Sequence, residues 1–103
     1  MKKYLGNAFS LQMLDTTMQH TVTVTPVSAS DVPIDCISCI GHPDTAQVVS
    51  GILGRAVAFS RISVSLDKGD VLYVAQITGG RLPAGATTLP DGFSITFLRV
   101  DIM

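Results

Sequence analysis

A nearly continuous apolar run at residues 71–77, Val-Leu-Tyr-Val-Ala-Gln-Ile, constrains the fold of this chain more than any other feature. The run is far shorter than the roughly 20 residues that a membrane helix needs, and its β-branched and aromatic residues favour a strand. A strand that is apolar on both sides has to be covered on both faces, so it belongs in the centre of a sheet. The sequence therefore predicts a sheet with packed chain on each side.

One helix is well defined by its start and stop signals. Pro43 at the first helical position and Asp44 in the first turn favour a start directly after His42. Gly54 follows the last apolar residue and favours a stop. Between these signals the apolar residues recur at helical spacing, as Val48, Val49, Ile52 and Leu53. We expect an amphipathic helix over residues 43–53.

Period-two patterns predict further strands. Residues 4–7 form a short one, and residues 21–25 alternate threonine with valine, so the valines are expected to face the core before the strand ends at Pro26. Residues 61–66 are expected to bury their even positions, to point Arg61 away, and to form a hairpin through the turn at residues 67–70. In the last strand one face carries Phe93, Ile95 and Phe97 and the opposite face carries Leu98, Val100 and Ile102. This change of face suggests a bulge near Phe97 or a dimer contact.

Two weaker helical segments complete the pattern. Ser10 is a candidate N-cap for a short helix with Leu11, Met13 and Leu14, and residues 28–37 can hold another, capped by Ser28 or Ser30 with Pro33 in its first turn. Residues 78–92 form a long loop rich in glycine and proline, a type that is usually functional or mobile. No linker or repeat interrupts residues 1–103. We expect one small α/β domain, a five-stranded mixed sheet flanked by two or three helices.

The charge of the chain narrows the class of partner. The formal net charge is −1 and the basic residues are scattered, which argues against a protein that binds long nucleic acid. A small anionic ligand needs only two or three well-placed arginines, and the chain offers Arg55, Arg61, Arg81 and Arg99. No apolar run reaches the length of a membrane span, and polar residues interrupt the N-terminus too early for a signal peptide. We therefore expect a cytoplasmic protein with reduced thiols and no membrane partner.

Two polar positions are candidates for an anion site. His42 stands at the start of the expected helix, where free backbone N–H groups favour a phosphate, and a histidine held there can give a proton to a group leaving phosphorus. The simpler alternative is a histidine that only caps the helix. Gly79 and Gly80 let the backbone approach a ligand while Arg81 points into it, and the alternative is a flexible turn with a solvated arginine.

Cys36 and Cys39 have the C-x-x-C spacing, and His42 follows three residues later. A zinc site needs four ligands, and only His20 or an aspartate is available to complete it. A thioredoxin-like pair is expected at the start of a helix after a central strand, whereas this pair ends a weak helix. We interpret the pair as two half-buried thiols without a metal, and a zinc or redox protein is the alternative.

Four segments occur in the order and with the spacing of a known family. They are residues 4–10 (Y-L-G-N-A-F-S) with Met13 and Leu14, residues 40–42 (I-G-H) with Thr45, Arg61 at the start of its segment, and residues 73–77 (Y-V-A-Q-I) leading to Arg81 and Leu82. In this combination the chain resembles the ring nucleases, the viral type III anti-CRISPR proteins and their bacterial relatives that cleave cyclic tetra-adenylate. The segments together span almost the whole chain.

The resemblance implies a symmetric homodimer that closes over the ring and cleaves it, without a metal or other cofactor, to linear di-adenylate with a 2′,3′-cyclic phosphate. His42 matches the catalytic histidine of the family, and Arg81 matches its active-site arginine. The positions that match ligand-holding residues are Asn7, Ser10, Arg61 and Gln76. Family members often carry a glutamate three residues after the arginine, where this chain has Ala84.

The residues themselves suit this chemistry. An RNA phosphodiester carries its own nucleophile, the adjacent 2′-hydroxyl, so the protein has to align it, stabilise charge on the non-bridging oxygens and protonate the leaving oxygen. Arg81 and the helix N–H groups suit the second task, and His42 suits the third. The sequence offers no dense carboxylate cluster for Mg²⁺, as a metal-free route would lead us to expect. A non-catalytic module that binds or sequesters a cyclic nucleotide is the alternative.

Overall fold

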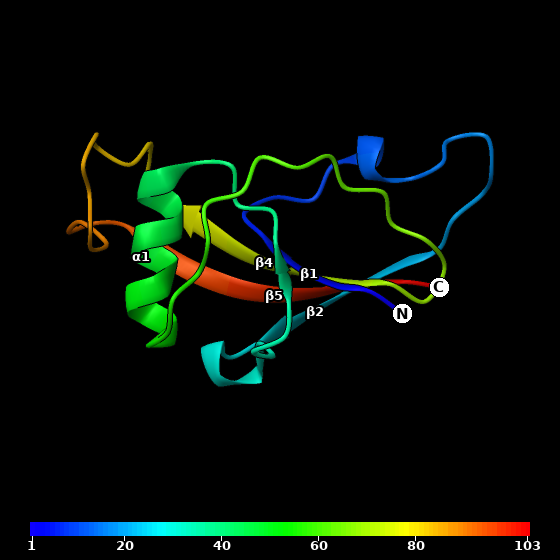
Figure 1. Ribbon diagram of the computed structural model, residues 1–103, viewed down its shortest axis with the longest axis horizontal. Coiled ribbons are helices and arrows are strands. Elements are labelled where there is room, and N and C mark those ends of the chain that lie inside the picture. The colour runs from blue at the N-terminus through cyan, green and yellow to red at the C-terminus, as the bar shows by residue number, and fades with distance from the viewer.

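The computed structural model, which describes residues 1–103, places β4 (Val71–Thr78) in the middle of a five-stranded sheet (Figure 1). The strand order is β2-β5-β4-β1-β3, with β1 parallel to β3 and β4, and with β5 antiparallel to β4 and β2. The remaining elements are β1 (Lys3–Gly6), η1 (Leu11–Met13), β2 (Val22–Val27), η2 (Ala29–Asp31), β3 (Ile37–Ser38), α1 (Pro43–Leu53) and β5 (Ser94–Ile102). The predicted α/β class, the mixed sheet and the central strand are confirmed.

The α1 helix has the predicted bounds, whereas the two other expected helices are single 3₁₀ turns. Gly54 ends α1 in the left-handed conformation, with a φ of 70°, which glycine adopts without strain. The Ser10 hydroxyl caps η1 by accepting the Gln12 N–H at 3.2 Å. Pro33 follows η2 instead of lying in its first turn, because the residue before a proline is pushed into an extended conformation and Val32 adopts one.

The sheet has a separate apolar core on each face. Alternate residues of β4 point to opposite sides, so Tyr73 and Ala75 join one core and Leu72 and Val74 join the other. The first core lies between the sheet and α1, to which the helix contributes Ala46 and Val49, with residues 27–40 and 53–57 along its edge. No α-helix covers the second core, and the short η1 turn and irregular chain close it instead, with Phe9, Met13, Leu14, Val64 and Leu66.

The two cores explain the two apolar faces of β5. Its pairing with β4 keeps one register from Val71↔Asp101 to Thr78↔Ser94, so the predicted bulge near Phe97 is wrong. Phe97 is buried in the first core, and Val100 and Ile102 are buried in the second. An uninterrupted strand with a core on each side therefore produces the pattern, and no dimer contact is needed to explain it.

Residues 61–66 do not form the predicted strand. Both edges of β4 are already occupied, by β1 and β5, so a hairpin partner has no free edge to join. The segment instead crosses the second core, where the Leu66 N–H donates to the Met13 carbonyl at 2.7 Å, and it leaves Ile62 45% exposed. The turn after it is present, with the Asp70 N–H donating to the Asp67 carbonyl at 2.9 Å.

The β2 strand differs from its prediction in two respects. It continues through Pro26 to Val27, which a proline permits because β2 is an edge strand that pairs only with β5. Val24 is 54% exposed, so the expectation that both valines face a core is wrong there. The irregular chain that covers the second core leaves this part of the edge strand uncovered.

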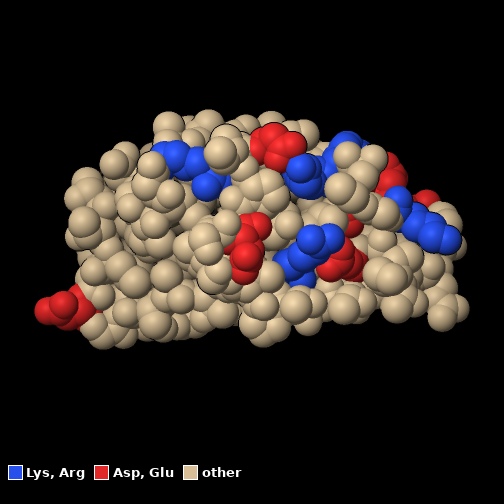
Figure 2. All heavy atoms as spheres, turned by 90° about the horizontal axis from the view of Figure 1, so that it is seen from below, with Lys and Arg blue, Asp and Glu red and all other residues tan.

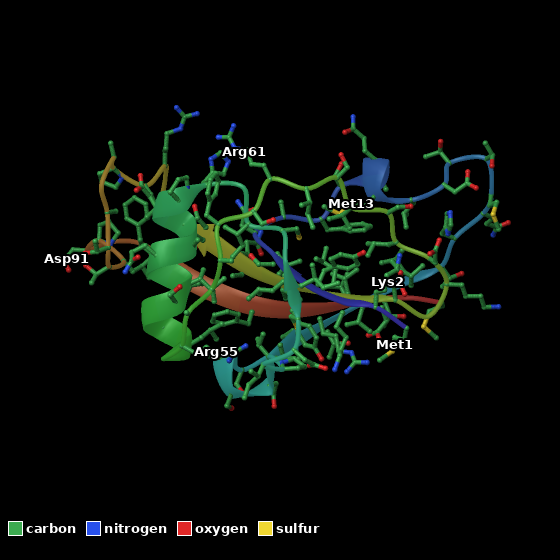
Figure 3. The ribbon with its side chains drawn as sticks, viewed as in Figure 1. Met1, Lys2, Met13, Arg55, Arg61 and Asp91 are labelled. Carbon is green, nitrogen blue, oxygen red and sulfur yellow. The ribbon has the colours of Figure 1, made fainter.

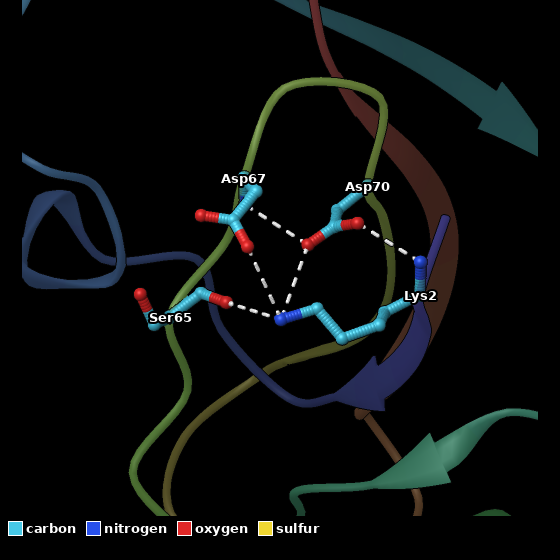
Figure 4. A network of polar contacts seen from close by, with 4 residues as sticks. All are labelled: Lys2, Ser65, Asp67 and Asp70. Carbon is cyan, nitrogen blue, oxygen red and sulfur yellow. Dashed lines mark hydrogen bonds and ion pairs between the residues drawn. The ribbon is translucent and has the colours of Figure 1, made fainter.

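The molecule is elongated, with extents of 41 × 24 × 23 Å. The α1 helix and the loop at residues 79–92 occupy one end, and both termini lie at the other (Figure 1). At the terminal end a polar network joins Lys2 to Ser65, Asp67 and Asp70 (Figure 4). None of the helices is both long and apolar enough to cross a membrane.

Candidate functional site

A cavity of about 570 Å³ lies where the first turn of α1 meets the ends of β1 and β4. Its walls come from four parts of the chain. These are the residue after β1, the start of α1, residues near the C-terminal end of β4 and the loop that follows β4. The lining residues are Asn7, His42, Asp44, Thr45, Ala75, Ile77, Gly80, Arg81 and Leu82. The parallel pairing of β1 with β4 explains why their carboxyl ends meet at this place.

His42 occupies the N-cap position of α1, but its ring does not cap the helix. Its backbone is extended, with φ −127° and ψ 124°, and its carbonyl accepts the Ala46 N–H at 3.0 Å as the first intrahelical bond. The imidazole is exposed and has no hydrogen-bond partner in the protein. His42 therefore occupies the cap position that the simpler alternative predicts, but it caps through its backbone alone, and its ring is available to a ligand in the cavity.

Arg81 reaches the cavity from the loop after β4, where it makes no ion pair or hydrogen bond. The two glycines before it have φ values of 115° and 133°, which other residues rarely adopt. A Cβ at Gly79 would lie 2.8 Å from the Gly92 carbonyl oxygen and 2.8 Å from the Phe93 Cα. The glycine pair therefore lets the two ends of the loop approach each other. The sequence predicts a close approach of this backbone to a ligand, and the structure shows a close approach to another part of the backbone.

Of the six residues predicted for the site, the cavity brings together Asn7, His42 and Arg81. Ser10 lies outside it, with its hydroxyl capping η1. Gln76 lies on the opposite face of β4, because its neighbours Ala75 and Ile77 line the cavity and side chains alternate along a strand. The alternation was visible in the sequence and already separates Gln76 from its neighbours.

Arg61 is also outside the cavity, but it is tied to the residue before His42. Its Nε donates to the Gly41 carbonyl at 2.8 Å, and its guanidinium lies 5.8 Å from the centre of the Phe59 ring. Figure 3 shows Arg61 beside the N-terminal end of α1. Arg61 therefore supports the segment that carries His42 and remains exposed beside the cavity.

The structure adds Thr45 to the site. Thr45 is 9% exposed, lines the cavity, and its hydroxyl has no hydrogen-bond partner in the protein. The structure contains no buried side-chain oxygen without a partner, so this hydroxyl is open to the cavity and is free to donate to a ligand oxygen. The signal in the sequence was its spacing, since a residue three positions after His42 lies on the same side of a helix.

Asp44 brings a carboxylate to the same cavity. The sequence shows it only as a helix-start signal, and at Ala84 this chain lacks the glutamate that family members often carry. Asp44 Oδ2 accepts the Gly85 N–H at 3.2 Å, so the first turn of α1 is joined to the loop. The carboxylate comes from the helix and not from the loop.

The two cysteines lie apart from this site and are free. Cys36 packs against the first core and Cys39 against the second, where its Sγ donates to the Leu5 carbonyl at 3.4 Å. Burial raises the pKa of both thiols, which disfavours the reactive thiolate. No group of three or more His, Cys, Asp or Glu side chains is placed to hold a metal ion. The interpretation as half-buried thiols therefore agrees with the structure better than a zinc or redox centre.

The charged side chains do not form a continuous basic surface on the face shown in Figure 2, where lysine and arginine lie beside aspartate. Several are paired, as Lys3 is with Asp35 at 2.7 Å and Arg99 is with Asp101 at 3.0 Å. Arg81, like Arg55, Arg61 and Lys68, has no acidic partner, and of these four it alone lines the cavity. The distribution suits a small anion at one place better than an extended polyanion.

Comparison with known proteins places this geometry in a family. Residues 3–92 match the family described as STIV B116-like. Among solved structures, the fold is similar to B116 of Sulfolobus turreted icosahedral virus, with 25% sequence identity, a TM-score of 0.78, and coverage of 98% of this chain and 99% of the other. The search of curated proteins found no match. The match to a viral protein agrees with the viral side of the family that the sequence resembles.

Proposed function

This chain belongs to the STIV B116-like family, and on that premise we propose that it is a ring nuclease that cleaves cyclic tetra-adenylate to linear di-adenylate with a 2′,3′-cyclic phosphate. One observation carries the proposal. A single cavity holds an unpartnered imidazole, an unpaired guanidinium and an amide, contributed by His42, Arg81 and Asn7 from distant parts of the sequence. These are residues that match the family positions of the ring nucleases.

In the proposed reaction the substrate supplies the nucleophile. The 2′-oxygen attacks the neighbouring phosphorus and loses its proton to water, while the bond from phosphorus to the 5′-oxygen breaks on the opposite side. The protein has to hold the ring so that these two oxygens lie in line through phosphorus. Such alignment removes much of the barrier by proximity and orientation alone.

His42 is the proposed general acid. Its ring has no hydrogen-bond partner in the protein, so in the imidazolium form a ring N–H is free to donate to a ligand in the cavity. It gives one proton to the 5′-oxygen as that oxygen leaves phosphorus. A positioned acid of this kind contributes roughly 10²–10⁴-fold to the rate.

Arg81 and the start of α1 are the proposed anion binders. The first intrahelical hydrogen bond is that of the Ala46 N–H, so the backbone N–H groups of Asp44 and Thr45 precede the helical ladder and remain available. Together with the Arg81 guanidinium they can stabilise charge that develops on the non-bridging phosphate oxygens. The Thr45 hydroxyl offers a further donor in the same cavity.

One cavity is too small for the whole substrate. Its volume of about 570 Å³ lies within the range of roughly 300–1,000 Å³ that suits one drug-sized molecule, whereas the ring contains four nucleotides. We propose a symmetric homodimer in which each copy holds one scissile phosphate. Arg61, which is exposed beside the cavity, then contacts the remainder of the ring, whereas the Ser10 hydroxyl caps η1 and Gln76 lies on the opposite face of β4. The substrate is an intracellular signal, so the proposed place of action is the cytoplasm, where cleavage ends type III CRISPR signalling.

The test is to incubate the purified protein with labelled cyclic tetra-adenylate in the presence of EDTA. We expect linear di-adenylate that carries a 2′,3′-cyclic phosphate. An intact ring that stays bound, one per dimer, would support the sequestering module and contradict the nuclease. Size measurement by light scattering, with and without the ring, tests the homodimer separately.

A further inference from the structure

The loop at residues 79–92 carries Arg81 but has very little attachment to the rest of the protein. Among its hydrogen bonds only one reaches another element, the Gly85 N–H donating to Asp44 Oδ2 at 3.2 Å. The others are local, such as the Ala86 N–H donating to the Pro83 carbonyl at 3.1 Å. Beyond its neck, the loop is therefore hydrogen-bonded to the rest of the protein through a single side chain of α1.

The turn that presents the Gly85 N–H is well defined. The bond between Pro83 and Ala86 closes a four-residue turn, and Gly85 has a φ of 80° at its third position, as a type II turn requires. No atom lies within 4 Å of a Cβ built on Gly85, so the glycine is needed for its conformation and not for space. The donor is thus held in one direction by the turn itself.

Arg81 lies between two fixed points. On one side is the neck of the loop, where Gly79 packs closely against Gly92 and Phe93. A Cβ built on Gly79 would lie 2.8 Å from the backbone of each of these two residues. On the other side is the bond from Gly85 to Asp44. Arg81 and Leu82 occupy the span between them, and both line the cavity.

We propose that Asp44 is a positioning residue, whose carboxylate clasps the loop through the Gly85 N–H and so keeps Arg81 at the cavity. The clasp follows from the hydrogen bond, and its effect on cleavage rests on the proposed function. A carboxylate in an anion site repels a phosphate by its charge alone, whereas its oxygen supplies the acceptor that holds the loop. The acceptor and the charge are separable by substitution.

Three variants separate them. Asp44→Ala removes both the acceptor and the charge, whereas Asp44→Asn removes the charge and keeps an acceptor oxygen. Asp91→Ala is the matched control, because Asp91 belongs to the same loop, is exposed and makes no hydrogen bond or ion pair. Figure 3 shows Asp91 at the far end of the molecule beyond α1.

The first measurement needs no activity. NMR measures the exchange of the Gly85 amide hydrogen with water in each variant. We expect exchange about three- to tenfold faster in Asp44→Ala, as the loss of one modest hydrogen bond implies, and rates near the wild type in Asp44→Asn and Asp91→Ala. Unchanged exchange in Asp44→Ala would overturn the clasp.

The second measurement is the cleavage of cyclic tetra-adenylate, with kcat and KM determined separately. We expect kcat to fall about three- to tenfold in Asp44→Ala, in line with a displaced Arg81, and to recover in Asp44→Asn. Equal losses in both variants, or faster cleavage in Asp44→Ala, would overturn the positioning role in favour of a charge effect. A wild-type protein that cleaves nothing contradicts the proposed function, while the amide exchange still decides the clasp.

Discussion

The polar side chains at the two ends of this elongated molecule differ in whether they have hydrogen-bond partners in the protein. At the terminal end Asp70 is 3% exposed and accepts the N–H groups of Lys2 and Asp67, each at 2.9 Å, while the Lys2 ammonium lies 3.6 Å from its carboxylate. At the α1 end the side chains of His42, Thr45 and Arg81 have no hydrogen-bond partner in the protein.

The difference indicates what each end is for. Paired and buried groups at the terminal end hold β1 to the turn before β4, so their value is stability. The unpartnered groups around the cavity are expected to contribute little to folding, as the proposed binding of another molecule requires. Substitutions at the two ends should therefore divide cleanly between activity and stability.

The largest expected effect is on His42. In His42→Ala the rate of ring cleavage should fall by about 10²–10⁴-fold, because the leaving 5′-oxygen loses its acid, while the melting temperature should not change. Single-turnover cleavage and thermal unfolding measure the two quantities. The matched control is His20→Ala, since His20 contacts the Asp15 carbonyl at 2.6 Å, away from the cavity. A similar loss of rate in both variants would contradict the assignment.

Two arginines sharpen the comparison. Arg81→Ala should lower kcat by roughly 10²–10³-fold, the usual loss when a donor to a developing oxyanion is removed, without loss of stability. Arg55 donates to the Val32 and Pro33 carbonyls at 3.2 and 2.8 Å, so Arg55→Ala should destabilise the fold by about 1–3 kcal/mol and leave the rate per folded molecule unchanged. Urea unfolding and cleavage assays on both variants test whether one loses only activity and the other only stability.

The elements of the fold differ in how well the sequence predicts them. Dense local signals predicted α1 to the residue and identified β4 as central, because caps and continuous apolar runs act within a few residues. Residues 61–66 carried an equally good strand pattern and failed. A strand needs a free sheet edge, and whether β4 has one depends on where β1 and β5 pair, which no local pattern contains.

The site shows the same division. Asn7, His42 and Arg81 were predicted from a resemblance in their segments, and the cavity joins them. The loop-to-helix bond of Asp44 depends on how the loop folds back, so no local pattern predicts it. The unpartnered state of the Thr45 hydroxyl was equally hidden, since an unmade hydrogen bond is a property of the packed structure.

At the terminal end Asp70→Ala should destabilise the fold by about 1–3 kcal/mol, because two backbone N–H groups lose their acceptor in a buried place. Ring cleavage per folded molecule should not change. Asp67→Ala is the control, since that side chain is 74% exposed and surface ion pairs contribute at most about 1 kcal/mol. An equal loss of stability in both variants would mean that the burial of Asp70 does not add to the stabilisation by this network.

The pH dependence of stability should be smaller but diagnostic. Burial by itself raises the pKa of Asp70, but the N–H groups of Asp67 and Lys2 and the Lys2 charge outweigh it, so the pKa lies below its ordinary value. A lowered folded pKa contributes stability above the unfolded value of about 3.9, and this stability is lost as the pH falls through the folded pKa. Urea unfolding from neutral to acidic pH should therefore show a steeper loss in the wild type than in Asp70→Asn.

The smallest effect is expected at Thr45, and it separates the two ends most sharply. Thr45→Val replaces a hydroxyl that has no partner in the protein with a methyl group, so the free energy of unfolding should change little. The affinity for cyclic tetra-adenylate should fall about two- to tenfold, since the bound ligand loses one hydrogen bond. Thr45→Ser, which keeps the hydroxyl, should restore the affinity. A Thr45→Val protein that unfolds more easily would mean that the hydroxyl serves the fold, and the contrast between the two ends would then fail at this residue.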